Sequence, residues 1–358
     1  MNYRTVKIHA LEDLGERGTK TIPINVQDPI TSLNFRVRYT VVEDAVRDNP
    51  EYSIIEKIEI VDGSDVLMEL SGEQMVAVNF YEGREKKCHI YASNYAAVQE
   101  FRMSVPFGRF FLDPELALDP SKFRNPQLKI TYDAENMEGG GTKVELDCVA
   151  ECFDEKVISP IGFLRHSLLH SYVGASETYE YIDLPTDLLV RKLYLQARHW
   201  EGASITNLNS VKLSEDNDKR VPFDLTAEEW AHKCGMEFGE IEVMFYMKPA
   251  GSGYPMYLAP CHMESYSAIS ENNNQFIYGA YGGGGFFPFT AASTSHVCKG
   301  SVRGFLPFFH WCYAFGDQQK IEDWYDVTRV GSLKLRIKSG TDGASTTYNT
   351  LLQQLRRY

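Results

Sequence analysis

Two ten-residue stretches of this chain repeat one another in chemical character. Residues 66–75 read VLMELSGEQM, and residues 221–230 read VPFDLTAEEW, at a constant offset of 155 positions (221 − 66). Only two pairs change character: Leu67/Pro222 and Gly72/Ala227. Ten matched positions can arise by chance, but an ordered repeat of one local plan is explained most simply by an internal duplication.

Each copy of the repeat predicts a strand that leads into a short helix. Apolar and polar residues alternate over 66–70 and 221–225, which is the period of a half-buried strand. A hydroxyl residue then precedes Gln or Glu by three positions, which is the capping box that begins a helix. The two boxes are Ser71 with Gln74 and Thr226 with Glu229. We therefore expect short helices near 72–80 and 227–234.

A second correspondence lies near the end of each half. The strand patterns LKITYD (128–133) and LKLRIKS (333–339) both follow an aromatic stretch, and these stretches are SVPFGRF (104–110) and GFLPFFHW (304–311). The offset has grown here to 205 positions (333 − 128), so the second half carries 50 more residues (205 − 155) between its markers. The Gly/Asn-rich stretch 271–285 lies in this insert, and its composition predicts a long surface loop.

The pattern of the whole chain favours antiparallel β-sandwiches. Strands are separated by turn signals, without the recurrent strand–helix alternation of a parallel sheet. Charge, Pro160 and Gly162 interrupt the pattern in FDEKVISPIG (153–162), where we place the boundary between two units. The sequence therefore predicts an N-terminal arm over 1–24, a first sandwich over 25–155, and a second over 156–358 with a long loop insertion around 250–300.

Composition opposes several classes of protein. The formal net charge of −13 argues against general nucleic-acid binding, which needs a basic surface, and Arg356-Arg357 is the one obvious basic fragment. The longest apolar run, FLPFFHWCYAF (305–315), is too short to span a bilayer, and the first residues lack an apolar signal region. Seven scattered cysteines, an odd number, indicate free thiols in a reducing cytoplasm.

The cysteines and histidines do not form a recognisable metal or catalytic motif. Cys148 and Cys152 share a face of an expected strand, but no second Cys/His pair with finger-like spacing follows, so we interpret them as buried thiols. HSLLH (166–170) has helical i, i+4 spacing without the Glu of the zinc-protease motif. The remaining pairs either point to opposite faces of a strand or lie in an aromatic run: Cys88-His89, Cys261-His262 and His310-x-Cys312.

Two further patterns are equally uninformative. GAYGGGGFF (279–287) resembles a phosphate-binding loop but lacks its Lys-Ser/Thr ending and a following helix. Acidic pairs such as Glu228-Glu229 and Glu322-Asp323 are too common to indicate catalysis. No catalytic, cofactor-binding or metal-binding residue is therefore predicted, no cofactor is expected, and the chain is not expected to be an enzyme.

The chain resembles the double jelly-roll major capsid proteins of icosahedral viruses, a group that includes lipid-containing bacteriophages and large eukaryotic DNA viruses. The resemblance rests on the duplicated element at 66–75 and 221–230 and on VPFGRFFLDPELALDPSKFRNPQLKITYD (105–133). It covers nearly the whole chain from residue 25 onward. It implies a mainly β fold of two tandem antiparallel eight-stranded β-sandwiches, a double jelly roll, with short helices after equivalent strands.

The same resemblance implies a structural function. Three copies, each with two similar sandwiches, would form a trimeric, pseudo-hexameric capsomer that self-assembles into the icosahedral shell of a virion after synthesis in the host cytoplasm. Its partners would be further copies of itself, neighbouring capsomers, and penton and minor capsid proteins. The long insertion would form outer towers or subunit contacts. The termini, including Arg356-Arg357, would contact an internal membrane or the genome, without sequence-specific nucleic-acid binding.

Two alternatives stay open from the sequence. One is a tandem β-sandwich that binds or cleaves carbohydrate, in which the aromatic residues, 13% of the chain, would stack on sugar rings. The other is a minor capsid or spike protein. A carbohydrate-active protein would show a groove lined by exposed Trp or Tyr and paired carboxylates, whereas a major capsid protein would form stable trimers without such a pocket.

Overall fold

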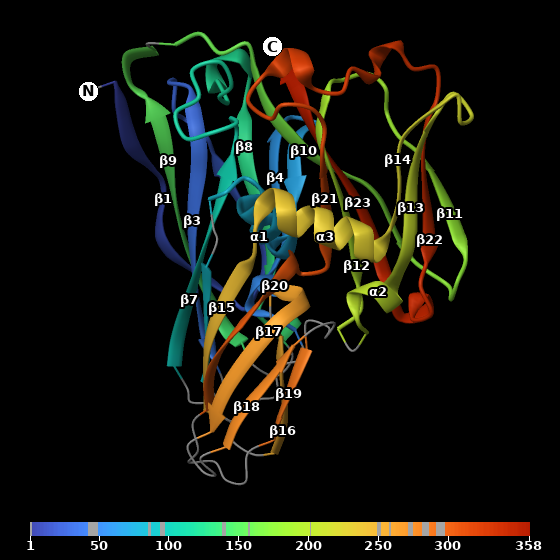
Figure 1. Cartoon of the computed structure of the whole chain (residues 1–358). Helices are drawn as coiled ribbons and strands as arrows, with labels where there is room; N and C mark the ends of the chain where they lie inside the picture. Colours follow the sequence, from blue (N-terminus) through green and yellow to red (C-terminus); the bar gives the residue numbers. More distant parts are fainter. Residues whose placement is uncertain are drawn as a thin grey trace.

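The fold is described from a computed structural model of the chain (Figure 1). The described residues are 2–41, 49–84, 87–93, 97–137, 141–156, 158–200, 202–248, 252–257, 259–270, 275–280, 286–290 and 298–358. They are mainly β-strand, with three α-helices and short 3₁₀ turns.

The first half of the chain forms two four-stranded sheets. One sheet has the strand order β1-β9-β3-β7 and the other has the order β2-β8-β4-β5. All neighbouring strands in both sheets are antiparallel. The strands are β1 (Tyr3–Gly15), β2 (Arg17–Pro23), β3 (Ile30–Val41), β4 (Ile55–Asp62), β5 (Asp65–Leu70), β7 (Ala97–Pro106), β8 (Pro126–Asp133) and β9 (Gly141–Phe153).

The second half repeats this arrangement in the orders β10-β23-β12-β21 and β11-β22-β13-β14, again with antiparallel neighbours. In each half the first strand pairs with the last, and the second strand pairs with the last but one, which is the jelly-roll order. The prediction of two eight-stranded antiparallel sandwiches is confirmed. The strands are β10 (Gly162–Val173), β11 (Tyr179–Asp183), β12 (Val190–Arg198), β13 (Leu208–Glu215), β14 (Arg220–Thr226), β21 (His310–Ala314), β22 (Leu333–Ser339) and β23 (Thr347–Arg357).

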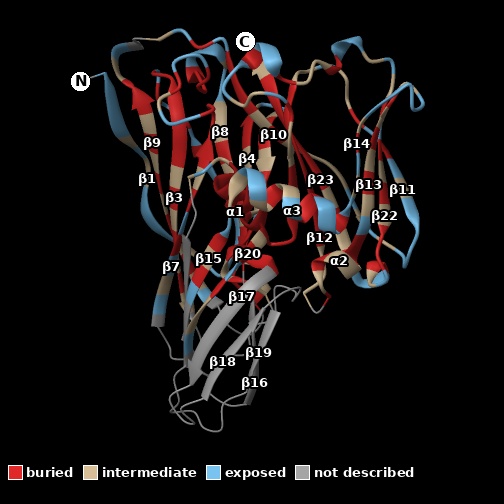
Figure 2. Ribbon diagram, viewed as in Figure 1, coloured by how far each residue is buried: buried red, intermediate tan, exposed pale blue. Residues whose placement is uncertain are grey.

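Alternate residues of the strands point inward and fill both sandwiches. Leu128 and Ile130 of β8 are buried, as are Leu335 and Ile337 of β22, while the residues between them are partly exposed. This follows from the period of a strand, in which successive side chains point to opposite faces. Figure 2 shows the buried residues running through all four sheets, and the buried apolar side chains of both halves belong to one continuous cluster.

The helices predicted after the repeated strands are confirmed. α1 spans Gly72–Tyr81 and α3 spans Ala227–Phe238, and both hydrogen bonds of each predicted capping box are present. Their surroundings differ, because all ten residues of α1 are buried but only four of the twelve in α3 are. A third helix, α2, spans Ser204–Asn207. Within the described part of the chain, no helix has the length and apolar character needed to cross a membrane.

Short 3₁₀ turns lie in the connections between these elements. They span Glu51–Ile54, Pro120–Lys122, Ala134–Met137, Asp154–Lys156, Ile321–Asp323, Val327–Arg329 and Gly343–Ser345. The chain passes from the first sandwich to the second in the connection from β9 to β10, which lies within FDEKVISPIG (153–162).

The insert of the second half, between α3 and β21, adds further strands. A five-stranded sheet has the order β18-β17-β20-β15-β6, in which β6 from the first half pairs in parallel with β15. β16 and β19 form a separate pair. The strands are β6 (Lys87–Ser93), β15 (Ile241–Lys248), β16 (Ser252–Tyr257), β17 (Pro260–Ser270), β18 (Gln275–Ala280), β19 (Phe286–Thr290) and β20 (Cys298–Pro307). Both halves of the chain therefore build the larger sheet.

Two segments differ from the sequence prediction. The expected N-terminal arm over 1–24 instead contains β1 and β2, which are edge strands of the first sandwich and pair with β9 and β8. Edge strands are largely exposed, so their sequences carry little of the alternation that identifies a strand. In the expected loop at 271–285, Gln275–Ala280 is strand β18, paired with β17, and the rest of that stretch lies outside the described residues.

The strand register also corrects one correspondence between the halves. β7 and β21 hold the same place in their sheets, beside β3 and β12. The isolated bridges of Ile30 in β3 and Val190 in β12 place these two strands at an offset of 160 positions. Leu33 lies opposite Val105, and its counterpart Leu193 lies opposite Tyr313, so Val105 of β7 corresponds to Tyr313 of β21. The counterpart of residues 104–110 is therefore 312–318 rather than 304–311. Both of the latter stretches are aromatic, so composition alone did not separate them.

Candidate functional site

The cysteines whose side chains the structure describes are buried free thiols. Cys148 and Cys152 lie in β9 with no exposed surface, and burial raises the pKa of both thiols. Cys234 of α3 donates from Sγ to the backbone oxygen of Cys312, at 3.3 Å. Among the described residues, no group of three or more His, Cys, Asp or Glu side chains is placed to hold a metal ion.

The histidines of HSLLH lie in a strand, β10, and not on a helix. His166 is buried, with Nε2 2.9 Å from Nε2 of Gln353, and burial lowers its pKa to about 4. His170 is half-exposed, with Nε2 3.4 Å from Oε1 of Glu180. The two rings therefore have different partners and do not form a shared site.

The remaining candidates of the sequence are not brought together either. His310 and His262 are both buried, and each contacts a different polar partner. Glu229 caps α3, while Asp323 accepts a hydrogen bond from a backbone N–H. Some candidates lie wholly or partly outside the description: the side chains of Cys88 and His89, and most of GAYGGGGFF (279–287).

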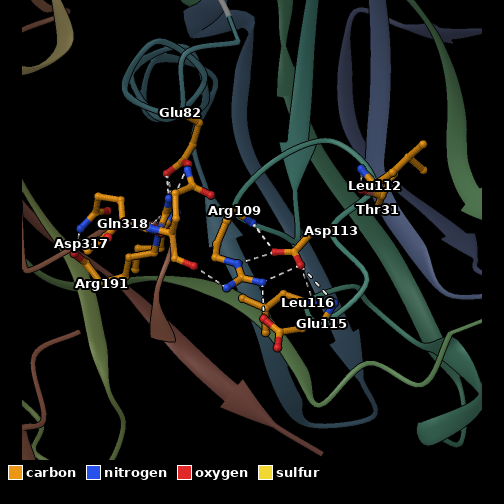
Figure 3. A network of polar contacts seen from close by, with 12 residues as sticks. Thr31, Glu82, Arg109, Leu112, Asp113, Glu115, Leu116, Arg191, Asp317 and Gln318 are labelled. Carbon is orange, nitrogen blue, oxygen red and sulfur yellow. Dashed lines mark hydrogen bonds and ion pairs between the residues drawn. The ribbon is translucent and has the colours of Figure 1, made fainter. Parts of the chain in front are cut away.

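A concentrated polar cluster lies where the two sandwiches meet. Just after α1, Glu82 accepts hydrogen bonds from Nη1 of Arg191 at 2.7 Å and from Nζ of Lys192 at 2.8 Å. Gln353 of β23 donates to the same carboxylate at 3.0 Å. The side chains of Glu82, Arg191 and Lys192 are each only 2% exposed. Figure 3 shows Glu82 reaching from the end of α1 toward Arg191.

The charges of this cluster stabilise one another in spite of burial. Burial opposes ionisation of Glu82, but the adjacent Arg191 and Lys192 hold its pKa well below its usual range. Burial lowers the pKa of Lys192, and the charge of Glu82 opposes that shift. Loss of one partner from such a buried network is strongly destabilising, because the remaining charge has no counter-ion. The cluster therefore favours one relative placement of the two sandwiches.

The other end of α1 makes a second contact with the second sandwich. Glu73 accepts hydrogen bonds from Nη1 of Arg198 at 2.9 Å and from Nε2 of Gln196 at 3.0 Å, both in β12. Toward the end of the helix, the hydroxyl of Tyr81 donates to the backbone oxygen of His310 in β21, at 2.5 Å. α1 therefore lies across the sheet that contains β12 and β21.

The connection between β7 and β8 makes a third contact. Arg109 binds Asp113 through two hydrogen bonds, Nε to Oδ2 at 2.7 Å and Nη2 to Oδ1 at 2.9 Å, and also pairs with Glu115 (Figure 3). Its Nη1 donates to the backbone oxygen of Gln319 in the second sandwich, at 2.6 Å. Hydrogen bonding to Asp113 raises the pKa of Arg109. This arginine therefore links the loop to the second sandwich as well as holding the loop in shape.

These three contacts form a structural joint, because their charges are paired with one another inside the protein. Sequence analysis did not predict them, although two adjacent cations within the apolar run LLVRKLYL (188–195) were an available signal. Hollows of 340, 440 and 550 Å³ occur in the described part of the chain, and none has Trp or Tyr in its walls. None of these hollows is therefore the aromatic-lined groove that a carbohydrate-binding protein would need.

The structure is similar to solved structures over nearly its whole length. Its TM-score is 0.62 with the STIV MCP, at 8% identity over 99% of this chain and 97% of that chain. For the major capsid protein P2 from Bacteriophage PM2 the TM-score is 0.54, at 9% identity over 99% and 98%. For the PBCV-1 virus capsid it is 0.52, at 11% identity over 99% and 93%. No family model and no curated protein matches the sequence.

These similarities concern the fold, because identities near 10% carry little information on residue roles. They agree with the strand orders of the two sandwiches. The chain is a double jelly roll, with its two halves joined by the buried contacts of α1 and the β7–β8 connection.

Proposed function

We propose that this chain is the major structural protein of a viral shell, a self-assembling subunit that carries out no catalysis. The observation that carries the proposal is the fold: two jelly rolls of identical strand order, joined by a buried polar network. The STIV MCP, the protein P2 from Bacteriophage PM2 and the PBCV-1 virus capsid share this fold over more than nine-tenths of their length.

The duplicated architecture suits a shell that is built from trimers. Three copies around a threefold axis present six similar sandwiches, so a trimer can fill a hexagonal position of an icosahedral lattice. Such a tile requires the two sandwiches of one chain to keep a constant relative placement. The buried pairing of Glu82 with Arg191 and Lys192 meets that requirement. We therefore infer trimeric, pseudo-hexameric capsomers.

The partners in this proposal are proteins of the same particle. They are further copies of the chain, neighbouring capsomers, and penton and minor capsid proteins, within a virion assembled in the host cytoplasm. Contact with an internal membrane would use the termini, where Arg357 is exposed and Arg356 pairs with Asp65 of the first sandwich. The net charge of −13 supports leaving sequence-specific nucleic-acid binding out of the proposal.

The native mass of the purified chain tests the proposal. Light scattering after size exclusion, over a range of concentrations, should give three times the 40.7 kDa of one chain, or particles far larger. A mass of one chain at every concentration would overturn the proposal, and binding or cleavage of a glycan panel would then favour the carbohydrate alternative.

A further inference from the structure

The two copies of the repeated helix present the same face to different surroundings. In α1 this face carries Glu73 and Tyr81, which are hydrogen-bonded to the second sandwich of the same chain, and Glu82 follows at the end of the helix. At the offset of 155 positions, the equivalent residues of α3 are Glu228, Met236 and Glu237. The inference drawn from this difference rests on the proposed function, since it names the surface through which copies of the chain meet.

On α3 this face is exposed in the single chain. Met236 is 85% exposed, the highest value among the large apolar residues that the structure describes, whereas its counterpart Tyr81 is 2% exposed. The side chain of Glu228 is 51% exposed, while Glu237, nine residues later, lies half a turn around the helix from Glu228. One exposed methionine needs no explanation. A face that is covered in one copy of a duplicated element and uncovered in the other indicates a covering partner outside the chain.

The sheet that receives α1 has a counterpart in the first sandwich. α1 lies against β12, and the strand in the same place in the first sandwich is β3. Ile30 of β3 and Val190 of β12 hold the same position in the two sandwiches. Ile30 forms a bridge with Leu118, before β8, and Val190 forms a bridge with Tyr325, before β22. Their offset of 160 positions (190 − 30) equates Arg38 with Arg198, the residue that binds Glu73. The first sandwich therefore carries a matching cation, Arg38, whose side chain is 31% exposed and pairs with Glu145 of the same sandwich at 3.3 Å.

This sheet of the first sandwich is hollowed. The hollow of 550 Å³ lies over β3, β7 and β9, and its walls include Asn34, Arg36, Arg102 and Asp147. Arg84, just after α1, lines the same hollow, and its Nη2 is buried without a hydrogen-bond partner among the described residues. An unsatisfied buried guanidinium nitrogen is costly, and a carboxylate is the group that pairs with it most strongly.

We propose that α3 of one copy docks in this hollow of a second copy, and so reproduces between chains the contact that α1 makes within a chain. Glu228 pairs with Arg38 of the second copy. Within the chain, the ring of Tyr81 lies 5.9 Å from the ring of Tyr194 in β12. Between chains, Met236 takes the place of Tyr81 and Asn34 of β3 takes the place of Tyr194, so Met236 enters the hollow beside Asn34. Among the arginines in the walls, Arg36 already binds Asp147 and Arg102 binds Glu100, so the acidic first turn of α3 is placed to satisfy the nitrogen of Arg84 that lacks a partner among the described residues.

The interface proposed here joins unlike surfaces, α3 of one chain and β3 of the next. In a linear assembly of copies, such a head-to-tail contact leaves one α3 and one hollow unused at the two ends. Every α3 and every hollow is occupied only when the copies close into a ring. A ring of three is the capsomer of the proposed function.

Substitution of Met236 tests the docking surface, with native mass by light scattering as the readout. M236D places a charge where an apolar side chain enters the interface, so we expect association at least tenfold weaker than that of the unmodified chain. The control is Y181D, which makes the same kind of change at an exposed residue of β11, an edge strand of the same sandwich. Y181D should associate as the unmodified chain does.

Charge reversal tests the proposed pair directly. E228R and R38E should each weaken association, because each places like charges opposite one another between chains. The double variant E228R/R38E should recover at least part of the association, since the two charges are then exchanged. A thermal melt of each variant establishes that the fold is intact.

The outcomes separate the two proposals. Association that is unchanged in M236D, or a double variant no better than the single variants, would show that α3 does not dock in this hollow, while the capsid proposal would stand. An unmodified chain that stays monomeric at every concentration would overturn both.

Discussion

Glu82 and Glu237 hold equivalent positions in the two copies of the repeat but have different roles. The carboxylate of Glu82 is buried between Arg191 and Lys192 of the second sandwich. The equivalent Glu237 of α3 is 31% exposed and pairs with Lys233 of its own helix at 2.6 Å. An exposed ion pair of this kind contributes little to the free energy of unfolding, whereas removal of one partner of a buried pair is strongly destabilising. Glu82 therefore stabilises the contact between the sandwiches because it is buried beside two cations, not because of its residue type.

Replacing Glu82 by glutamine should destabilise the chain by about 3–5 kcal/mol, because Arg191 and Lys192 would stay buried without a counter-charge. Urea unfolding at neutral pH, followed by circular dichroism, measures the change. E237Q is the matched control, and its effect should stay within about 0.5 kcal/mol. If E82Q and E237Q had the same effect, the buried pair would not be what holds the sandwiches together.

At the scale of the element, the two mismatches in the repeat follow from what packs on each copy. Gly72 begins α1 where a Cβ would lie 2.1 Å from the backbone oxygen of Tyr52, so the site excludes a side chain, whereas Ala227 fits at the start of α3. Leu67 is fully buried in β5, which packs near β10 of the second sandwich. Pro222 is partly exposed in β14, an edge strand, where a missing N–H is tolerated.

Replacing Gly72 by alanine should lower stability by about 2–3 kcal/mol, because the methyl group can be accommodated only if the helix start moves away from the 3₁₀ turn at Glu51–Ile54. A thermal melt reports the loss as a lower Tm. The reverse change in the second copy, A227G, should cost about 1 kcal/mol or less. A G72A variant as stable as the unmodified chain would contradict the close contact at this helix start.

At the scale of the whole molecule, the two sandwiches behave as one packed body. Their buried apolar residues form one continuous cluster, and α1 is enclosed between them. The C-terminal residue Tyr358 returns to the first sandwich, where its hydroxyl donates to the backbone oxygen of Ala117 at 2.6 Å. Arg356 pairs with Asp65 nearby. Separation of the sandwiches would expose all of these contacts together.

We therefore expect the two sandwiches to unfold in a single transition. The tryptophans offer a local probe, because all four lie in the second half of the chain: Trp200, Trp230, Trp311 and Trp324. Far-ultraviolet circular dichroism reports the strands of both halves. The fluorescence and dichroism curves should coincide in urea. A fluorescence transition at a different urea concentration would show that the sandwiches unfold independently.

The parts of the fold that the sequence predicted correctly depend on neighbours along the chain. The period-two strands of the repeat, the capping boxes of Ser71 and Thr226, and the helices that follow them are all confirmed. The pairing of strands is repeated as well, since Leu70 lies opposite Ile58 and Leu225 lies opposite Val211, but the partner strands are offset by 153 positions (211 − 58) rather than 155. These features are local, because the residues that form them are close together in the sequence and their pattern can be recognised there.

Tertiary structure decided the rest, because the deciding contacts join residues far apart in the sequence. β1 and β2 were expected as an arm, and they are strands only because β9 and β8 supply their partners. Glu82 is separated from Arg191 by 109 positions, so no local pattern connected them. The sequence by itself determined two copies of one jelly-roll plan. Only packing decided that α1 is buried between the sandwiches and that the same face of α3 is exposed.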